Sequence, residues 1–334
     1  MTTALVLIVS FGFIMAGAEL FTNAIEWVGK RFGLPEGAVG SLLAAVATAL
    51  PETMVPIIAI VFGEGSSGHE IGTGAILGAP FMLGTLAFCI TGIAVLVFSR
   101  SGKRAPKVTI NKKVMLRDLS FFLKVYALAI LAAFIPSHSM KVVVAIGLFA
   151  LYGWYAYKTI TDDDEADEEE ELHPLFLAKK KAEPATSMIL LQVAIAMAAI
   201  VYGANLFVGG IEVVAEHFGI SAFILSVLIT PVATELPEKF NSVTWIRRGK
   251  DTLALGNITG AMVFQSSVIP AIGILLTPWE LSGAALINGL MALIMPAIVY
   301  CLVRFSGKLN PRVLISSGLV YLVFVIMVLS GFKI

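Results

Sequence analysis

The sequence predicts an all-α integral membrane protein, with ten transmembrane helices arranged as two inverted five-helix repeats. Three observations support this fold class: the composition is strongly apolar, segments of membrane-spanning length recur along the chain, and one half of the sequence matches the other. Of the 334 residues, 58% are hydrophobic and only 14% are charged, which is far from the balance of a water-soluble domain. We therefore expect lipid to be the main solvent of this chain.

Ten segments are long and apolar enough to cross a hydrocarbon core of roughly 30 Å as helices. Their approximate ranges are 3–29, 35–62, 71–99, 114–135, 139–159, 187–215, 221–246, 252–277, 281–304 and 311–332. The first segment is too long for the core of a signal peptide, so we expect it to remain as the first span. Cys89 and Cys301 are single thiols within these segments, and we expect no disulfide framework.

The connections between the spans differ in charge, and this difference predicts orientation. Lys and Arg are concentrated after spans one, three, five, seven and nine, whereas the other connections carry mainly acidic residues. Because short basic loops stay on the cytoplasmic side, we expect a multi-pass protein of the plasma (inner) membrane with both termini on the outer side. The oligomeric state cannot be read from these patterns.

An internal duplication accounts for the repeats. Residues 17–52 match residues 203–238 without gaps, with 16 identities in 36 positions, and GAILGA at 74–79 then aligns with GNITGA at 256–261. Each half contains five spans, so the second half must cross the membrane in the opposite direction, as in many secondary transporters. We predict a first repeat at 1–160, an acidic cytoplasmic linker at 161–186 and a second repeat at 187–334, with signature regions at about 40–84 and 226–268.

The predicted linker contains the run TDDDEADEEEEL, followed by a cluster of lysines. Like charges at this density resist compact packing, which favours a solvated spacer. An acidic loop that senses or gathers divalent cations is the alternative, and the sequence leaves it open.

Glu52 and Glu238 are the leading candidates for function. Both lie near the middle of their spans and at equivalent positions of the duplication. A carboxylate at bilayer depth costs several kcal/mol unless it faces a cavity or a partner, so such residues are functional candidates by default. Thr48 and Thr234 each precede a glutamate by four residues, which places each Thr and its Glu on one helix face.

Prolines directly before these glutamates predict how the helices open. Pro51 and Pro237 have no backbone N–H, so we expect each helix to open one turn earlier and to expose carbonyl oxygens. Two such faces would offer four carboxylate oxygens and several carbonyls. Calcium takes about six to eight oxygen ligands in flexible arrangements, so the pattern predicts a divalent-cation site.

Two pairs of glycines recur at four-residue spacing, Gly74 with Gly78 and Gly256 with Gly260. Small residues at this spacing let helix backbones approach closely. We therefore expect these glycines to serve helix contacts rather than ion binding.

The motifs ATALPE at 47–52 with GAILGAP at 74–80, and ATELPE at 233–238 with GNITGAM at 256–262, resemble the paired signatures of the calcium/cation antiporter superfamily. The resemblance covers essentially the whole chain and is sodium/calcium exchanger-like. It implies the five-plus-five topology, with Glu52 and Glu238 as the carboxylates that hold a divalent cation. It also implies that the backbone carbonyls of Thr48 and Thr234 complete that site.

The chain departs from this pattern where sodium-using members carry Ser after the Thr, Ser after the second Gly, and Asn or Asp four residues further on. The corresponding residues here are Ala49 and Glu235, Ala79 and Ala261, and Leu83 and Gln265. Most of the hydroxyls that would bind sodium are therefore missing, and Glu235 and Gln265 join the candidate metal ligands. The stretch KDTLALGNITGAMVFQ is similar to the proton-coupled branch of the superfamily.

These features predict a secondary-active antiporter that moves a divalent cation, with Ca2+ favoured, in exchange for H+ or Na+. Burial favours the protonated form of a lone carboxyl group and a neighbouring cation favours the ionised form, so a glutamate pair can trade two protons for one calcium ion. Alternating access would take place around the two glutamates. The expected partners are cations as substrates and the lipid bilayer, without nucleic acid, and no cofactor is expected.

Two alternatives stay open. Glu235 and Lys239 have the spacing and order of a favourable helix ion pair, and Lys239 could instead act as a tethered counter-ion. The whole site could also be the selectivity ring of a passive channel. An enzyme is disfavoured, because the sequence contains no base and nucleophile pairing, metal motif or cofactor fingerprint.

Overall fold

The structure is a computed structural model that describes residues 2–31, 49–63, 65–162, 173–179, 183–281 and 283–330. For residues 2, 160, 162, 236–241 and 329 it describes the backbone alone. Throughout these residues the regular elements are helices, which confirms the all-α fold class. The helices are α1 (Thr2–Arg31), α4 (Leu50–Phe62), α5 (Gly65–Met82), η2 (Leu83–Ala87), α6 (Phe88–Arg100), α7 (Lys112–Ala132), α8 (His138–Asp162), η3 (Phe176–Ala178), α9 (Thr186–Phe218), α10 (Ala222–Arg247), α11 (Asp251–Leu276), α12 (Gly283–Ser306) and α13 (Pro311–Leu329).

Seven helical stretches among the described residues have the length and composition to cross a membrane. They are α1, the run from α5 to α6, α8, α9, α11, α12 and α13, and two shorter apolar helices occur at Leu50–Phe62 and Ala222–Glu235. A multi-pass membrane protein is therefore confirmed. The count of ten stays a prediction, because residues 35–48 of the second predicted span lie outside the described residues.

A π-helical turn, η2, joins α5 and α6 into one long helix. Pro80 lies one turn upstream and lacks the N–H that a regular α-helix would use, and such irregular turns are common where the backbone ladder is interrupted. The hydroxyl of Ser317 in α13 donates to the carbonyl of Thr85 at 2.6 Å. The neighbouring helix thus satisfies a backbone oxygen within the irregular turn.

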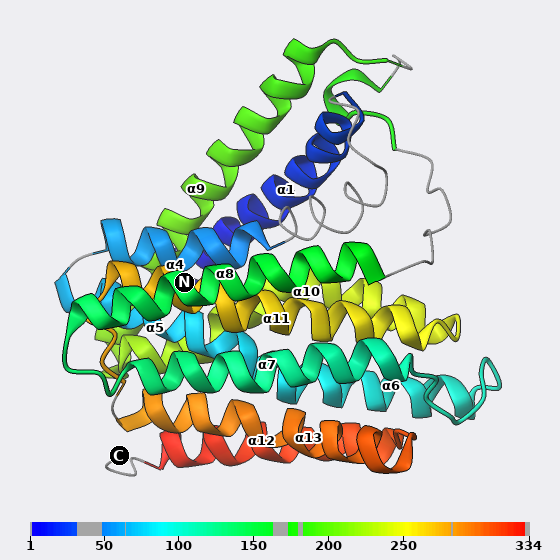
Figure 1. Ribbon diagram of the computed structural model, residues 1–334. Coiled ribbons are helices and arrows are strands. Elements are labelled where there is room, and N and C mark those ends of the chain that lie inside the picture. Colours follow the sequence, from blue (N-terminus) through cyan, green and yellow to red (C-terminus); the bar gives the residue numbers. More distant parts are fainter. Residues whose placement is uncertain are drawn as a thin grey trace.

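The helices pack as a tilted pair beside a bundle. Helix α1 lies along α9, while α10 lies along α5, and α11 packs against α7 and α8 (Figure 1). Helices α12 and α13 cover the other side of the run from α5 to α6. The largest buried cluster lies within this bundle, with Leu77, Phe122 and Met262 among its members.

Glycines bring the two helices of the tilted pair into close contact. A Cβ atom at Gly17 of α1 would lie 3.0 Å from the carbonyl oxygen of Ala196, and one at Gly203 of α9 would lie 2.8 Å from that of Ser10. Real Cβ atoms rarely come so close, so only glycine allows this backbone approach. Gly17 and Gly203 occupy matching positions of the duplicated sequence.

The predicted contact role of the glycine pairs is confirmed for the first pair. A Cβ atom at Gly74 would lie 2.7 Å from the carbonyl oxygen of Phe223, and one at Gly78 would lie 2.5 Å from that of Val227, so α5 and α10 meet backbone to backbone. A Cβ atom at Gly256 or at Gly260 would meet no described residue within 4 Å. The contact role of that second pair stays a prediction.

The segment of the predicted linker at residues 173–179 contacts both α1 and α9. Trp27 Nε1 and Asn23 Nδ2 donate to the carbonyl of its first residue at 3.0 and 3.3 Å. Gln192 Nε2 in turn donates to Asn23 Oδ1 at 2.9 Å, and Leu175 is fully buried against the pair. Polar side chains inside the pair hold this segment, whereas the acidic run at 163–172 lies outside the described residues.

Candidate functional site

Glu52 lies in the first turn of α4 and is only 7% exposed. The helix begins at Leu50, with Pro51 in its first turn, where a missing N–H costs nothing. Residues 32–48, directly upstream of Ala49, lie outside the described residues, and Thr48 is among them. The opening expected one turn before Pro51 falls on these residues and stays a prediction. Glu52 lies in the first turn of α4, at the positive end of the helix dipole.

The corresponding opening before Pro237 was wrong. Helix α10 continues from Ala222 to Arg247 without a break at this proline. A helix interior tolerates proline when packing against neighbours compensates for the lost hydrogen bond, and α5 and α11 flank α10 here. The side chains of Glu238 and Lys239 lie outside the described residues. The meeting of Glu238 with Glu52, and the pairing of Lys239 with Glu235, stay predictions.

Two of the predicted site residues do come together. Glu235 of α10 is 1% exposed and Gln265 of α11 is 2% exposed, and Gln265 Nε2 donates a hydrogen bond to Glu235 Oε1. No described group donates to the other amide atom, Gln265 Oε1. A buried amide oxygen of this kind is a suitable ligand for a hard cation.

Thr234 continues a stripe of hydroxyl side chains along α10. Ser226, Thr230 and Thr234 follow each other at four-residue spacing, which leads to position 238 on the same helix face. All three are buried. The hydroxyls of Ser226 and Thr230 lie 3.0 Å apart, Ser226 donates to the carbonyl of Ile71 at 2.6 Å, and Thr234 donates to the carbonyl of Thr230 at 3.2 Å.

Helix α4, which carries Glu52, packs mainly against α5 and α9 and also touches α10 and α11. Helices α10 and α11 carry Glu235 and Gln265. The packing therefore brings the two signature regions together through their helices.

Sequence reasoning missed a further buried carboxylate, Asp118 of α7, which is 2% exposed. Its oxygens accept hydrogen bonds from the hydroxyl of Tyr155 at 2.6 Å, the hydroxyl of Thr259 at 2.7 Å and Nε of Arg117 at 3.2 Å. Asp118 therefore ties α7 to α8 and to the GNITGA segment of α11. The signal that could have found it is a lone acid inside a predicted span.

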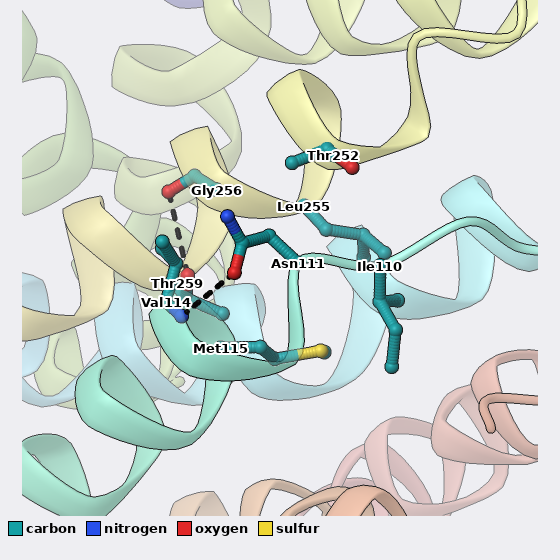
Figure 2. A pocket seen from close by; sticks show the side chains of 8 residues that line it. All are labelled: Ile110, Asn111, Val114, Met115, Thr252, Leu255, Gly256 and Thr259. Carbon is teal, nitrogen blue, oxygen red and sulfur yellow. Dashed lines mark hydrogen bonds between the residues drawn. The ribbon is translucent and has the colours of Figure 1, made fainter. Parts of the chain in front are cut away.

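A small hollow of about 10 Å³ lies beside this cluster, between the start of α7 and α11 (Figure 2). Asn111 caps α7 by accepting a hydrogen bond from the N–H of Val114 at 3.2 Å, and Thr259 also reaches the carbonyl of Gly256 at 3.4 Å. The lining residues are Ile110, Asn111, Val114, Met115, Thr252, Leu255, Gly256 and Thr259. Half of this lining is apolar and it contains no carboxylate, so we do not place the cation site here.

Comparison with known proteins decides the family. The family model described as "Sodium/calcium exchanger protein" matches residues 2–161 and 188–330. The chain belongs to this family. Both matched segments contribute to this assignment, and the unmatched residues between them correspond to the predicted linker.

Individual relatives and solved structures are similar to this chain over most of its length. Inner membrane protein YrbG of Escherichia coli K12 is 22% identical over 324 residues, which cover 96% of this chain and 95% of YrbG. The structure of the H+/Ca2+ exchanger CAX is similar with a TM-score of 0.74 at 17% identity, over 98% of this chain and 82% of CAX. The sodium-calcium exchanger NCX_Mj gives 0.58 at 18% identity, over 100% and 99%.

At these identities the structural likeness shows the fold alone. Membership of the family nevertheless makes the chain an ion exchanger of the membrane and not an enzyme, as the sequence predicts.

Proposed function

We propose that this exchanger moves a divalent cation, with Ca2+ favoured, against H+ or Na+, by alternating access around Glu52 and Glu238. One observation carries the proposal: Glu52 is buried at the start of α4 inside a membrane bundle. An ionisable side chain in a membrane costs free energy, so such residues usually serve a function. Thr234, Glu235 and Gln265 add buried oxygen ligands from α10 and α11. The carbonyl of Thr48 and the carboxylate of Glu238 complete the proposed site.

The coupling ion that the residues favour is the proton. Ala49 and Ala79 stand where a sodium site would need hydroxyls. In the second repeat Ala261 is equivalent to Ala79, and Glu235, which accepts a hydrogen bond from Gln265, is equivalent to Ala49. Carboxyl groups that bind a divalent cation in one state can bind protons in another. The name of CAX describes an H+/Ca2+ exchanger and that of NCX_Mj a sodium-calcium exchanger, so both couplings fit this fold.

Alternating access is assigned to the tilted pair of α1 and α9. In this proposal residues 1–160 and 187–334 are inverted repeats, and each repeat contributes its first helix to the pair. The close approach at Gly17 and Gly203 supports the idea, because smooth backbone surfaces without bulky side chains allow helices to slide. Both termini are assigned to the outer face of the plasma membrane.

Uptake of radioactive calcium into proteoliposomes tests the proposal. Vesicles with an outward proton gradient, an outward sodium gradient or no gradient are compared for the wild type, Glu52→Gln and Glu238→Gln. Glu216→Gln is the matched control, because Glu216 is an exposed glutamate at the end of α9. We expect proton-driven uptake that both site variants abolish and the control retains.

Two other outcomes would change the proposed mechanism. Uptake driven only by sodium would overturn the proton coupling while retaining the antiporter. Calcium flux that needs no counter-ion on the opposite side would replace the antiporter with a channel, since a channel conducts without exchange.

A further inference from the structure

The ends of α6 and α10 enclose an open hollow that the exchange mechanism does not use. It offers about 480 Å³ of space and is lined by Lys103, Thr244, Arg247 and Arg248. Three of its four lining residues are cationic and the fourth carries a hydroxyl, so every lining side chain can donate hydrogen bonds. The predicted topology places this hollow at the cytoplasmic rim of the membrane.

The two turns that frame the hollow have the same geometry. Gly102 follows α6 with a φ of 72° and Gly249 follows α10 with a φ of 76°, a conformation that favours glycine. The N–H of Lys103 bonds to the carbonyl of Phe98 at 3.0 Å, and the turn after α10 closes with the equivalent bond at 2.9 Å. Such glycine-terminated helix ends have a defined shape, so the cationic residues stand on fixed turns.

A buried ion pair locks these turns together. The guanidinium of Arg104 holds both carboxylate oxygens of Asp251, with Nη2 at 2.6 Å from Oδ2, and the two side chains are only 5% and 1% exposed. Arg104 Nη1 also donates to the carbonyl of Ile246 at 2.8 Å. Arg104 adjoins Lys103 in sequence and Ile246 adjoins Arg247, so the contact sets the distance between the walls of the hollow.

Among the described residues, no carboxylate balances the cations of the hollow. Arg104 and the backbone N–H of Thr109 already engage the carboxylate of Asp251, and within the described chain none of Lys103, Arg247 and Arg248 forms a salt bridge. Two guanidinium groups and an ammonium therefore line one space, and arginine binds phosphate through paired hydrogen bonds.

We propose that this hollow binds the phosphate group of an anionic membrane lipid. A lipid headgroup is favoured over free phosphate because of the place and the surroundings of the hollow. Anionic headgroups lie at the level where the helices leave the membrane. Val97 and Ile93 of α6 are exposed about one and two turns before its end, which gives an apolar strip for an acyl chain.

The bound headgroup would fix the cytoplasmic end of α10, the helix that carries Thr234 and Glu235. Each basic residue near the membrane surface strengthens the attraction of an anionic lipid by roughly fivefold. Loss of all three cations therefore weakens headgroup binding on the order of 100-fold. The binding of the headgroup does not depend on which ion the protein transports.

The test uses the full-length protein in nanodiscs of neutral phosphatidylcholine, with or without phosphatidylglycerol. Lipid retention is measured by native mass spectrometry, and the thermal unfolding midpoint is recorded in parallel. The hollow variant combines Lys103→Gln, Arg247→Gln and Arg248→Gln. The matched control combines Arg304→Gln, Lys308→Gln and Arg312→Gln, which removes three exposed basic residues at the end of α12, in the connection and at the start of α13.

We expect phosphatidylglycerol to be retained and to raise the unfolding midpoint of the wild type and the control, but not of the hollow variant. Equal retention by both variants would overturn the proposal. A third arm adds inorganic phosphate to neutral nanodiscs, and stabilisation there that equals the effect of phosphatidylglycerol would assign the hollow to free phosphate instead. The single variant Arg248→Gln removes one charge and should retain less phosphatidylglycerol than the wild type. Arg248→Lys, which keeps the charge, should retain most of the lipid.

Discussion

The contact between α5 and α10 makes a sharp prediction at Gly78. Substitution by alanine would place a Cβ atom 2.5 Å from the carbonyl oxygen of Val227, 2.9 Å from its Cα and 2.8 Å from Cγ of Pro231. Two of these atoms belong to backbone and the third to a proline ring. None of them can rotate away, so the helices themselves must separate.

The magnitude follows from the geometry. The new contact with Val227 would be about 0.9 Å shorter than an ordinary contact of 3.4 Å, and both backbones lie inside the buried bundle. Overpacking of this kind costs about 1–3 kcal/mol. We expect Gly78→Ala to lower the free energy of unfolding by about 2 kcal/mol and to reduce calcium uptake, because α10 carries Glu235.

Gly153 provides the control. It lies in α8, where a Cβ atom would meet no described residue within 4 Å, and alanine in place of glycine stabilises an open helix position by about 1 kcal/mol. Unfolding midpoints of Gly78→Ala, Gly153→Ala and the wild type are compared in one detergent. Equal midpoints for Gly78→Ala and Gly153→Ala would refute the close approach of α5 and α10.

Two further predictions concern buried polar contacts. Asp118→Asn removes the charge that Arg117 and Thr259 contact, and loss of one partner from a buried pair should destabilise the protein by about 3 kcal/mol. Adding Thr259→Val should then cost little more, whereas fully additive effects in the unfolding assay would argue against a shared contact. Asn23→Leu removes the amide that holds the linker, so limited proteolysis should cleave residues 173–179 faster than in the wild type. Unchanged protection would show that burial of Leu175 alone is sufficient.

Membrane-spanning segments are the part of the fold that the sequence predicts best, because apolar length is a strong physical signal. The segment predicted at 311–332 corresponds to α13 at Pro311–Leu329, and the one at 139–159 corresponds to α8 at His138–Asp162. Spacing also predicts the contact at Gly78, since small residues four apart have few other uses in a membrane helix. Both signals are local in the chain.

Contacts between distant residues could not be predicted in the same way. Asp118 stands beside Arg117 near the start of a predicted span, which is typical of a residue at the membrane surface, and nothing in the sequence names Thr259 as its partner. Asn23 and Gln192 gave no signal either, because a lone amide in a span has many possible partners. The error at Pro237 arose because local sterics predict a break that packing on both sides of α10 can compensate.

The pairing of α1 with α9 has a consequence for how the protein is made. Helix α1 ends at Arg31 and α9 begins at Thr186, so roughly 155 residues are synthesised in between, which takes about 8 to 30 seconds at usual translation rates. During that interval α1 is in the membrane without the surface that covers Gly17 and Asn23. A ribosome that stops before α9 would therefore leave a first half with a polar side chain facing lipid, and that half should be recognised and degraded rather than stored for later assembly.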